Sequence, residues 1–180
     1  MTRRAGTLLV LLAAAACGDG GPATVTGDVF VVLDTGAEID VVGAPVRLIE
    51  ERASTDTALA RLCAVRRDEL AAAVADDGDP EEVRRAVSDR AWEARETLLA
   101  REALRATTTG GDARFRLDSL APGSYRVVTD AVVQGERWSW MEPATLRGGD
   151  SLHVPLGNHN ADGDPFRCQL LRAMEADADG

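Results

Sequence analysis

The apolar residues of this 180-residue chain change their period twice, and this change constrains the fold more than any other feature. Over 24–33 and 44–51 they are β-branched or alternate, as in strands. Between 57 and 105 they follow helical spacing, and after residue 106 the period of two returns. A segment patterned for a helix does not serve as a strand. The pattern therefore predicts a mainly β domain with an α-helical insertion.

The helical part divides at the segment DDGDP, which ends in Asp79 and Pro80. Asp caps helix N-termini, Pro is favoured at the first helical position, and the two glutamates that follow favour the positive end of the helix dipole. A helix from residue 80 to about 105 would be about 38 Å long, which exceeds the width of a small β-sandwich. We therefore expect residues 57–105 to form a helical hairpin.

One side of this second helix carries small apolar residues at spacings of three and four, namely Val83, Val87, Ala91, Ala94 and Leu98. We expect this stripe to face the rest of the protein, and the neighbouring Trp92 to pack against the sandwich or the first helix. The opposite face distinguishes two roles. A contiguous apolar patch there would favour a protein partner, whereas an all-polar face would make the hairpin a structural brace.

The second β-rich part contains short strands separated by Gly and Pro turns. We expect them at 113–120 (ARFRLDSL), 124–133 (SYRVVTDAVV), about 136–147 and about 151–156. Such spacing is typical of an antiparallel Ig-like sandwich. The prediction is a sandwich of about six to seven strands over 24–157, followed by a C-terminal segment, 158–180, that packs back and is partly disordered.

The segment TTTGGDARFRLDSLAPGSYRVVT resembles the carboxypeptidase-regulatory-like family of prealbumin-like β-sandwiches. The residues that carry the resemblance are Thr107 to Thr109, Phe115, Leu117, Leu120, Pro122, Gly123 and Tyr125. The chain departs from the family pattern at Arg114, where Gly is usual, and in the helical hairpin, where the family has a short link. The resemblance implies an accessory or structural module without catalytic residues.

The N-terminal stretch MTRRAGTLLVLLAAAAC has a basic start, an apolar run too short to span a bilayer, and small residues before Cys17. Its end, AAAC, resembles the lipobox of bacterial lipoproteins. The resemblance implies that 1–16 is a cleaved signal peptide, that Cys17 is lipidated, and that 17–23 is a flexible tether. The protein would then be anchored in the cell envelope, at the outer membrane of a diderm because Gly18 replaces the inner-membrane Asp. The alternative is plain secretion.

Two cysteines remain once Cys17 is assigned to the lipid, and they are Cys63 and Cys168. An even number of cysteines in an oxidising compartment favours a disulfide. The alternative is two unrelated buried thiols. A bridge between them would close a loop of more than 100 residues and contribute roughly 4–5 kcal/mol in the chain-entropy model.

Composition and motifs make several functions improbable. The formal net charge of −10 disfavours nucleic acid, which requires clustered positive charge. The chain has only two histidines, His153 and His159, without the cysteine or helical spacing of a zinc site. It also lacks the Gly-x-Ser-x-Gly elbow of serine hydrolases. We therefore expect no enzyme activity and no cofactor.

Two segments remain as candidate binding sites. Trp138 and Trp140 are two residues apart on an expected strand and so share a face. They either pack in the core or form an exposed pair for carbohydrate or peptide. The second segment, NHNADGDPF, places oxygen-bearing side chains at alternate positions, as a calcium loop does, at Asn158, Asn160, Asp162 and Asp164. Two of these are neutral and the usual glutamate is Gln169, so a polar turn is the stronger interpretation.

The sequence thus supports two hypotheses. The first is a non-enzymatic, membrane-anchored module with a protein partner in the cell envelope, contacted through the helical hairpin. The second is a carbohydrate- or peptide-binding module that uses Trp138 and Trp140.

Overall fold

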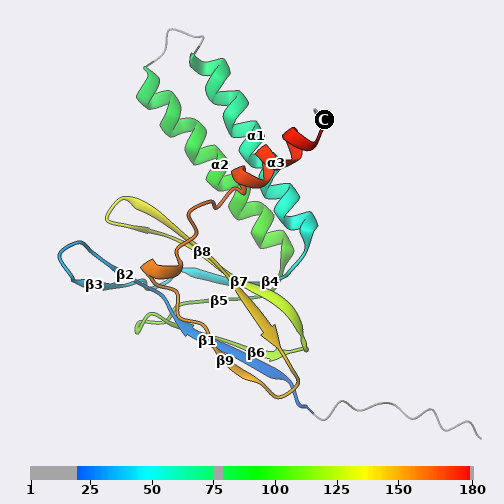
Figure 1. Ribbon diagram of the computed structural model, residues 1–180. Helices are drawn as coiled ribbons and strands as arrows, with labels where there is room; N and C mark the ends of the chain where they lie inside the picture. Colours follow the sequence, from blue (N-terminus) through cyan, green and yellow to red (C-terminus); the bar gives the residue numbers. More distant parts are fainter. Residues whose placement is uncertain (1–19, 75–78, 179–180) are drawn as a thin grey trace, which may run out of the picture.

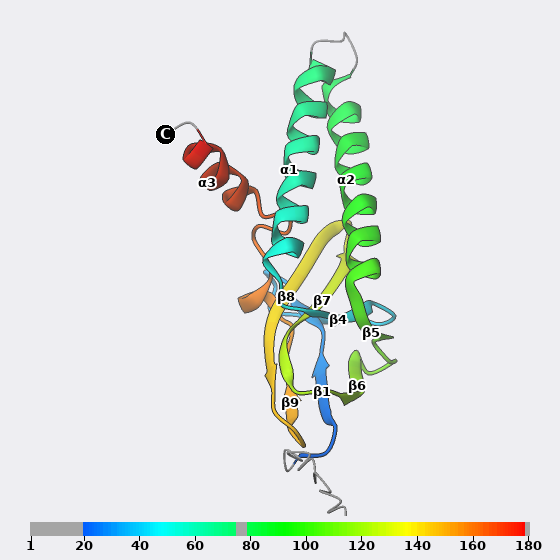
Figure 2. The same cartoon turned by 90° about the vertical axis from the view of Figure 1, so that its right-hand side faces the viewer.

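A computed structural model describes residues 20–74 and 79–178, so the expected signal peptide and Cys17 lie outside the described residues. It shows a β-sandwich with a helical hairpin that rises from one sheet (Figures 1 and 2). The predicted fold class, mainly β with a helical insertion, is confirmed. No helix in the described ranges is both long and apolar enough to cross a membrane.

The sandwich has two main sheets and a small ribbon. One sheet has the order β6 (Arg114–Leu120), β1 (Ala23–Asp28) and β9 (Ser151–His153). The other has the order β5 (Ala103–Thr108), β4 (Pro45–Glu50), β7 (Gly123–Val133) and β8 (Glu136–Leu146). The ribbon pairs β2 (Phe30–Val32) with β3 (Glu38–Asp40).

Two details of the strand prediction are wrong. The expected strand 24–33 divides after Asp28, because β1 pairs with β6 and β9 while β2 turns away to pair with β3. The last strand pairs in parallel with β1, so the first sheet is mixed and not purely antiparallel. Gly27 allows this close packing, since a Cβ there would lie 2.1 Å from the carbonyl oxygen of Val154 and 2.5 Å from the Phe115 ring.

The main core lies between the two sheets and is apolar. Its larger members include Val25, Val46, Leu48, Phe115, Leu117, Tyr125, Val127, Trp140 and Leu156. The resemblance to the prealbumin-like pattern had singled out Phe115, Leu117 and Tyr125, and all three are buried here. The Tyr125 hydroxyl donates to the Ala121 carbonyl oxygen at 3.0 Å, which ties the turn before β7 to the core.

The hairpin consists of α1 (Ala53–Val74) and α2 (Pro80–Glu102). The predicted start of α2 is confirmed, because the Asp79 carboxylate accepts a hydrogen bond from the Glu81 backbone N–H at 2.9 Å. The first helix starts earlier than expected, at residue 53, and the second ends at residue 102 because β5 follows directly.

The base of the hairpin packs on the outer face of the four-stranded sheet. A second apolar cluster forms there from Ile49, Leu59, Leu98, Leu99, Val128 and Met141. The predicted stripe on α2 is only partly correct. Val87, Ala91 and Leu98 are buried, but Ala94 is exposed and Arg95 occupies the buried position beside it.

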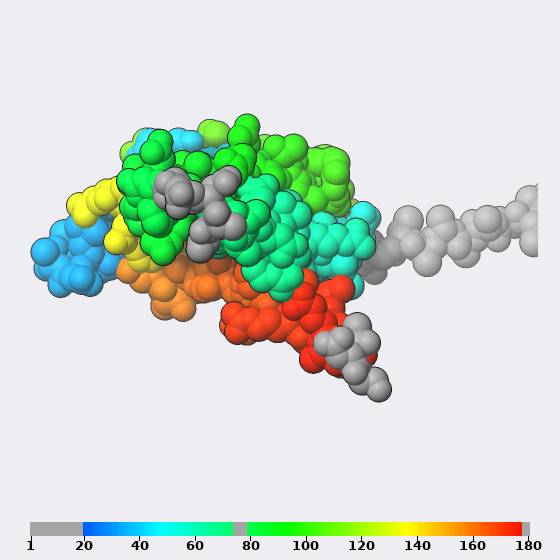
Figure 3. Space-filling model, turned by 90° about the horizontal axis from the view of Figure 1, so that it is seen from above, coloured from blue at the N-terminus to red at the C-terminus, as the bar shows by residue number. Residues whose placement is uncertain are grey.

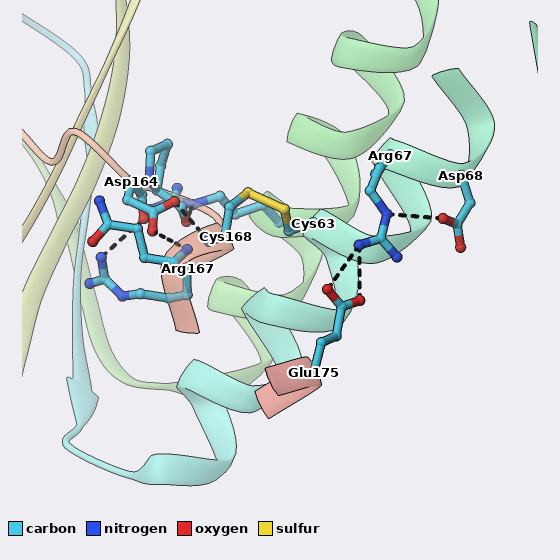
Figure 4. Close-up of a disulfide and its surroundings, with 10 residues drawn as sticks. Cys63, Arg67, Asp68, Asp164, Arg167, Cys168 and Glu175 are labelled. Atoms are coloured by element: carbon cyan, nitrogen blue, oxygen red, sulfur yellow. Dashed lines mark hydrogen bonds and ion pairs between the residues drawn. A yellow bond between two sulfur atoms is a disulfide. The ribbon is translucent and has the colours of Figure 1, made fainter. Parts of the chain in front are cut away.

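The C-terminal segment returns to the hairpin. It forms a short 3-10 helix, η1 (Asn158–Asn160), and then α3 (Cys168–Ala178), which packs along α1. Cys63 on α1 and Cys168 at the start of α3 form a disulfide, with their Cα atoms 5.5 Å apart (Figure 4). The Arg67 guanidinium binds the Glu175 carboxylate at 2.9 Å and adds a second link between these helices.

Candidate functional site

The two tryptophans of β8 occupy different environments. Their rings stack with centroids 6.1 Å apart, as expected for side chains on one face of a strand. Trp140 is fully buried in the sandwich core, and its indole N–H donates to the Gly157 carbonyl oxygen at 2.9 Å. The hypothesis of an exposed tryptophan pair is therefore wrong. Only Trp138, which is partly buried, remains accessible to a ligand.

The asparagines proposed for calcium are used in local structure. The Asn158 amide accepts from the Val32 backbone N–H and donates to the Val32 carbonyl oxygen, both at 2.7 Å. The Asn160 amide bridges the Gly157 backbone N–H and the Pro155 carbonyl oxygen, both at 2.9 Å. Both amides thus fix the chain after β9.

The two aspartates of the same segment are also engaged. Asp162 pairs with Arg167 at 3.0 Å, and Asp164 accepts from the backbone N–H groups of Cys168 and Gln169 at the start of α3 (Figure 4). Within the described ranges no three acidic, histidine or cysteine side chains gather as metal ligands would. The segment is a set of caps and turns, and its four side chains do not converge on a cation.

A pocket of about 350 Å³ lies between α2 and the turn-proximal half of the β7–β8 hairpin. We call it the α2–β7 pocket. The helix contributes Asp89, Trp92, Glu93 and Glu96. The sheet contributes Pro45, Asp130, Ala131, Val132, Arg137 and Trp138. Sequence reasoning had found Trp138 as a site residue but not this pocket.

The pocket lies where β7 extends past its neighbour. The β4–β7 ladder ends with the pair Val46 and Thr129, whereas the β7–β8 ladder continues to Val133 and Glu136. Residues 130–133 of β7 therefore pair with β8 alone. Their edge toward β4 carries backbone groups without a strand partner, and these groups border the pocket.

Arg95 fixes α2 against this part of the sheet. Its side chain is fully buried, and its guanidinium pairs with Asp130, donates to the Ser139 hydroxyl at 2.9 Å, and donates to the Pro165 carbonyl oxygen at 2.9 Å. One residue of the helix thus holds β7, β8 and the C-terminal segment together. Sequence reasoning missed it, because an arginine on a helix is expected to be solvated.

Burial dominates the electrostatics of this pair. It raises the pKa of Asp130 above the ordinary value, although the charge of Arg95 acts in the opposite direction. Burial likewise lowers the pKa of Arg95 against the influence of Asp130. The Oδ1 atom of Asp130 is buried and has no hydrogen-bond partner among the described residues. A hydrogen-bond donor that reached this buried, unpaired oxygen would therefore be bound favourably.

Trp92 closes the other side of the pocket. Its ring meets Phe166 edge to face with centroids 5.0 Å apart, so it packs against the C-terminal segment. The guanidinium groups of Arg95 and Arg137 lie 5.2 Å and 5.5 Å from its centroid. Arg137 also binds the Asp89 carboxylate at 2.7 Å. Cations therefore already occupy the neighbourhood of this ring.

The comparisons with known proteins point to the fold. No protein-family model and no curated protein matches the chain. Among solved structures, it is similar to a Pseudomonas aeruginosa protein described as a candidate for carbohydrate binding, with 18% identity, TM-score 0.43, and coverage of 80% of this chain and 93% of that one.

Two pilins are also similar. The minor pilin of Streptococcus agalactiae has 9% identity and a TM-score of 0.36, over 77% of this chain and 44% of the pilin. The major pilin subunit of Bacillus cereus has 9% identity and a TM-score of 0.31, over 79% of this chain and 30% of the pilin. The chain thus spans less than half of each pilin.

Proposed function

We propose that this protein is a non-enzymatic, lipid-anchored module of the bacterial cell envelope that binds a ligand in the α2–β7 pocket. One observation carries the proposal. The chain enters the sandwich at the end opposite the helical hairpin, so an anchor at Cys17 would direct the hairpin and the pocket away from the membrane (Figures 1 and 2). Gly18 after the anchor favours the outer membrane in a diderm.

The point of entry supports a short distance to the membrane. Gly21 accepts a hydrogen bond from the Gly149 backbone N–H at 2.6 Å, beside the turn that precedes β9, and β1 begins two residues later. Ala23 follows Cys17 by six residue steps, which span at most about 20 Å when extended. The base of the sandwich would therefore lie close to the lipid surface.

The outer face of α2 favours a structural role for the hairpin over an apolar surface that binds a protein partner. The exposed residues along α2 are charged side chains, alanines, a threonine and the first-turn proline: Pro80, Glu81, Glu82, Arg84, Arg85, Ala86, Asp89, Arg90, Glu93, Ala94, Thr97, Ala100 and Arg101. This face lacks the apolar patch that would favour a protein partner. We therefore assign α2 the role of a brace, which holds one wall of the pocket against the sheet.

The lining of the pocket favours binding over catalysis. Its described residues include no serine, cysteine or histidine that could act as a nucleophile or a neutral base. Three of its carboxylates are held in ion pairs. Such a site can orient polar groups of a ligand through fixed charges and aromatic walls.

A protein partner is a second candidate, supported by α3. Leu170 and Met174 are four residues apart on this helix and are 36% and 43% exposed, so they share an accessible face. Figure 3 places α3 on the flank of the hairpin away from the β7–β8 turn. Replacing Met174 with Glu should reduce cross-linking of the protein in envelope membranes if this face binds a partner, and should leave it unchanged otherwise.

Intact mass spectrometry of the protein from membranes tests the anchor. The expected result is a chain that begins at Cys17 and carries the mass of acyl groups, together with release of a Cys17→Ser variant from the membrane fraction. A mature N-terminus after Cys17, or an unmodified cysteine, would contradict the anchored form and leave a secreted protein.

A further inference from the structure

We infer that the α2–β7 pocket binds a neutral saccharide, with Trp138 as the surface for one face of a sugar ring. The inference rests on the proposed binding function and specifies the chemical class of the ligand. It also corrects the location that the sequence suggested, since the site pairs Trp138 with residues of α2 and not with Trp140.

The volume and the walls of the pocket suit a small polar ligand. About 350 Å³ lies within the roughly 300–1,000 Å³ of small-molecule sites. The pocket curves round the free edge of β7: Trp138 and Ala131 line it from the sandwich side of the sheet, whereas Val132 and the carboxylates of Asp89 and Glu93 line it from the helix side. A sugar ring has the matching division, with C–H groups on a face and hydroxyl groups around the rim.

Trp138 is held in place before any ligand arrives. The planes of the two tryptophan rings are 17° from parallel, so Trp140 backs the Trp138 ring, and the buried N–H of Trp140 is fixed by Gly157. A side chain that is already ordered loses little conformational entropy when a ligand binds to it. This rigidity favours a ligand that stacks on a flat surface.

The charges of the pocket disfavour an ionic ligand. Three of the four carboxylates are already paired, Asp89 with Arg137, Glu96 with Arg47, and Asp130 with Arg95. A cation would meet the guanidinium groups beside Trp92, and an anion would meet the carboxylates along α2. A neutral polyhydroxyl compound uses both, because its hydroxyl groups donate to carboxylates and accept from guanidinium groups.

Glu93 and the edge of β7 supply hydrogen-bonding groups that are not otherwise engaged. Among the described residues, no cation lies within ion-pair distance of Glu93, which is exposed at the pocket. The backbone of residues 130–132 borders the same space without a partner strand on that side. A carboxylate and backbone carbonyl groups are strong acceptors for sugar hydroxyl groups.

A peptide that adds as a strand fits this edge less well. At the pocket end of β7, residues 130–133 extend beyond the β4–β7 ladder, and this free segment is shorter than an average strand of about five to six residues. Pro45, at the start of β4, lines the pocket and has no backbone N–H to offer. We therefore favour a saccharide and treat a peptide as an outcome of the test.

The test is a titration of the soluble domain, residues 20–180, monitored by tryptophan fluorescence and calorimetry. The probes are neutral di- and trisaccharides of glucose, galactose, mannose and N-acetylglucosamine, with uronic-acid oligomers, deacetylated amino-sugar oligomers and a lysine-containing peptide for comparison. We expect at least one neutral sugar to bind, and the charged probes to bind more weakly.

The variants assign the binding to the pocket. Trp138→Ala should weaken it by about tenfold or more, equivalent to about 1.4 kcal/mol, while Trp138→Phe should retain most of it. Glu93→Gln should weaken binding several-fold. The matched control Glu82→Gln, on the same helix but outside the pocket, should not change it.

Three results would overturn the inference: no binding by any neutral sugar, stronger binding by a charged probe or the peptide, or sugar binding that Trp138→Ala leaves intact although its circular dichroism matches the parent. Failure of the anchor is separate, since Cys17→Ser should release the protein from membranes without changing sugar affinity. Conversely, Trp138→Ala should stay on the membrane.

Discussion

The sandwich and the helical hairpin are held together by different forces. The sandwich encloses one continuous apolar core between its two sheets. The hairpin has a small apolar cluster at its base, and farther out it depends on a disulfide, on the buried Arg95, and on ion pairs. Burial of apolar surface is insensitive to any single charge, whereas these links fail when one partner is removed. The pocket lies where the two regions meet, so its shape depends on the second kind of contact.

The largest expected effect concerns the covalent link. Replacing Cys63 and Cys168 together with Ser should lower the free energy of unfolding by about 4–5 kcal/mol, because the bridge joins residues 105 apart and restricts the unfolded chain. Denaturant unfolding by circular dichroism measures it. The sandwich should still fold, since its core does not include these residues. An unchanged midpoint would show that the bridge contributes little.

The next effect concerns Arg95. Arg95→Met should cost about 3 kcal/mol, because it leaves the Asp130 carboxylate buried without its partner. Adding Asp130→Leu should recover part of this loss, since the double variant removes both charges. If the double variant is less stable than the single one, the ion pair is not what holds α2, and the statement that such links hold the hairpin is wrong.

Acid should weaken the links near the base of the hairpin. Burial pushes the pKa of Asp56 upward, but hydrogen bonds and charges from Arg126 and Arg167 outweigh it, so that the pKa lies below its ordinary value of 3.8. Its contribution to stability is therefore present above pH 3.8 and disappears as the pH falls through the folded-state pKa.

The variant Asp56→Asn isolates this carboxylate. It should lose about 1 kcal/mol at neutral pH, because a partly screened ion pair is replaced by a neutral amide. Its deficit should shrink in acid, where the parent is also protonated. Asp130 acts in the opposite sense, since its raised pKa makes stability fall as the pH rises above 3.8. A deficit of Asp56→Asn that is constant with pH would contradict the assignment.

The smallest effect is expected toward the tip. Arg90 on α2 and Glu69 on α1 join at 2.9 Å, but both side chains are well exposed. Arg90→Ala should therefore change the free energy of unfolding by about 0.5 kcal/mol or less. Thermal melts of this variant beside Arg95→Met compare an exposed and a buried arginine on the same helix. A large loss at Arg90 would mean that the tip contributes to the fold as much as the base does.

Features encoded locally were predictable from the sequence. The Asp79–Pro80 pair marks the start of α2, and the alternation around Phe115 and Tyr125 marks two strands of the sandwich. The cysteine count led to the disulfide. Each of these signals lies in neighbouring residues or in the even number of remaining cysteines, so no knowledge of distant contacts was needed.

The pocket depends on contacts between distant segments and was not predictable. Arg95 and Asp130 are 35 residues apart, and the sequence around neither residue indicates that the two form a buried ion pair. The spacing of Trp138 and Trp140 gave their shared face, but burial of one and partial exposure of the other follow from the packing of the sheets. Asn158 and Asp164 have the spacing of cation ligands, yet they serve as caps because the chain turns there.

Amide hydrogen exchange by mass spectrometry tests most directly the contrast between the sandwich core and the tethered hairpin. If the sandwich is held by its core and the hairpin by separate links, exchange should be slowest in β4 and β7, intermediate over residues 91–99 of α2, and fast over residues 80–86 and in the outer half of α1. Arg95→Met should speed exchange over residues 91–99 and leave β4 and β7 unchanged. Uniform protection along both helices, or loss of protection in the sandwich of this variant, would contradict the account.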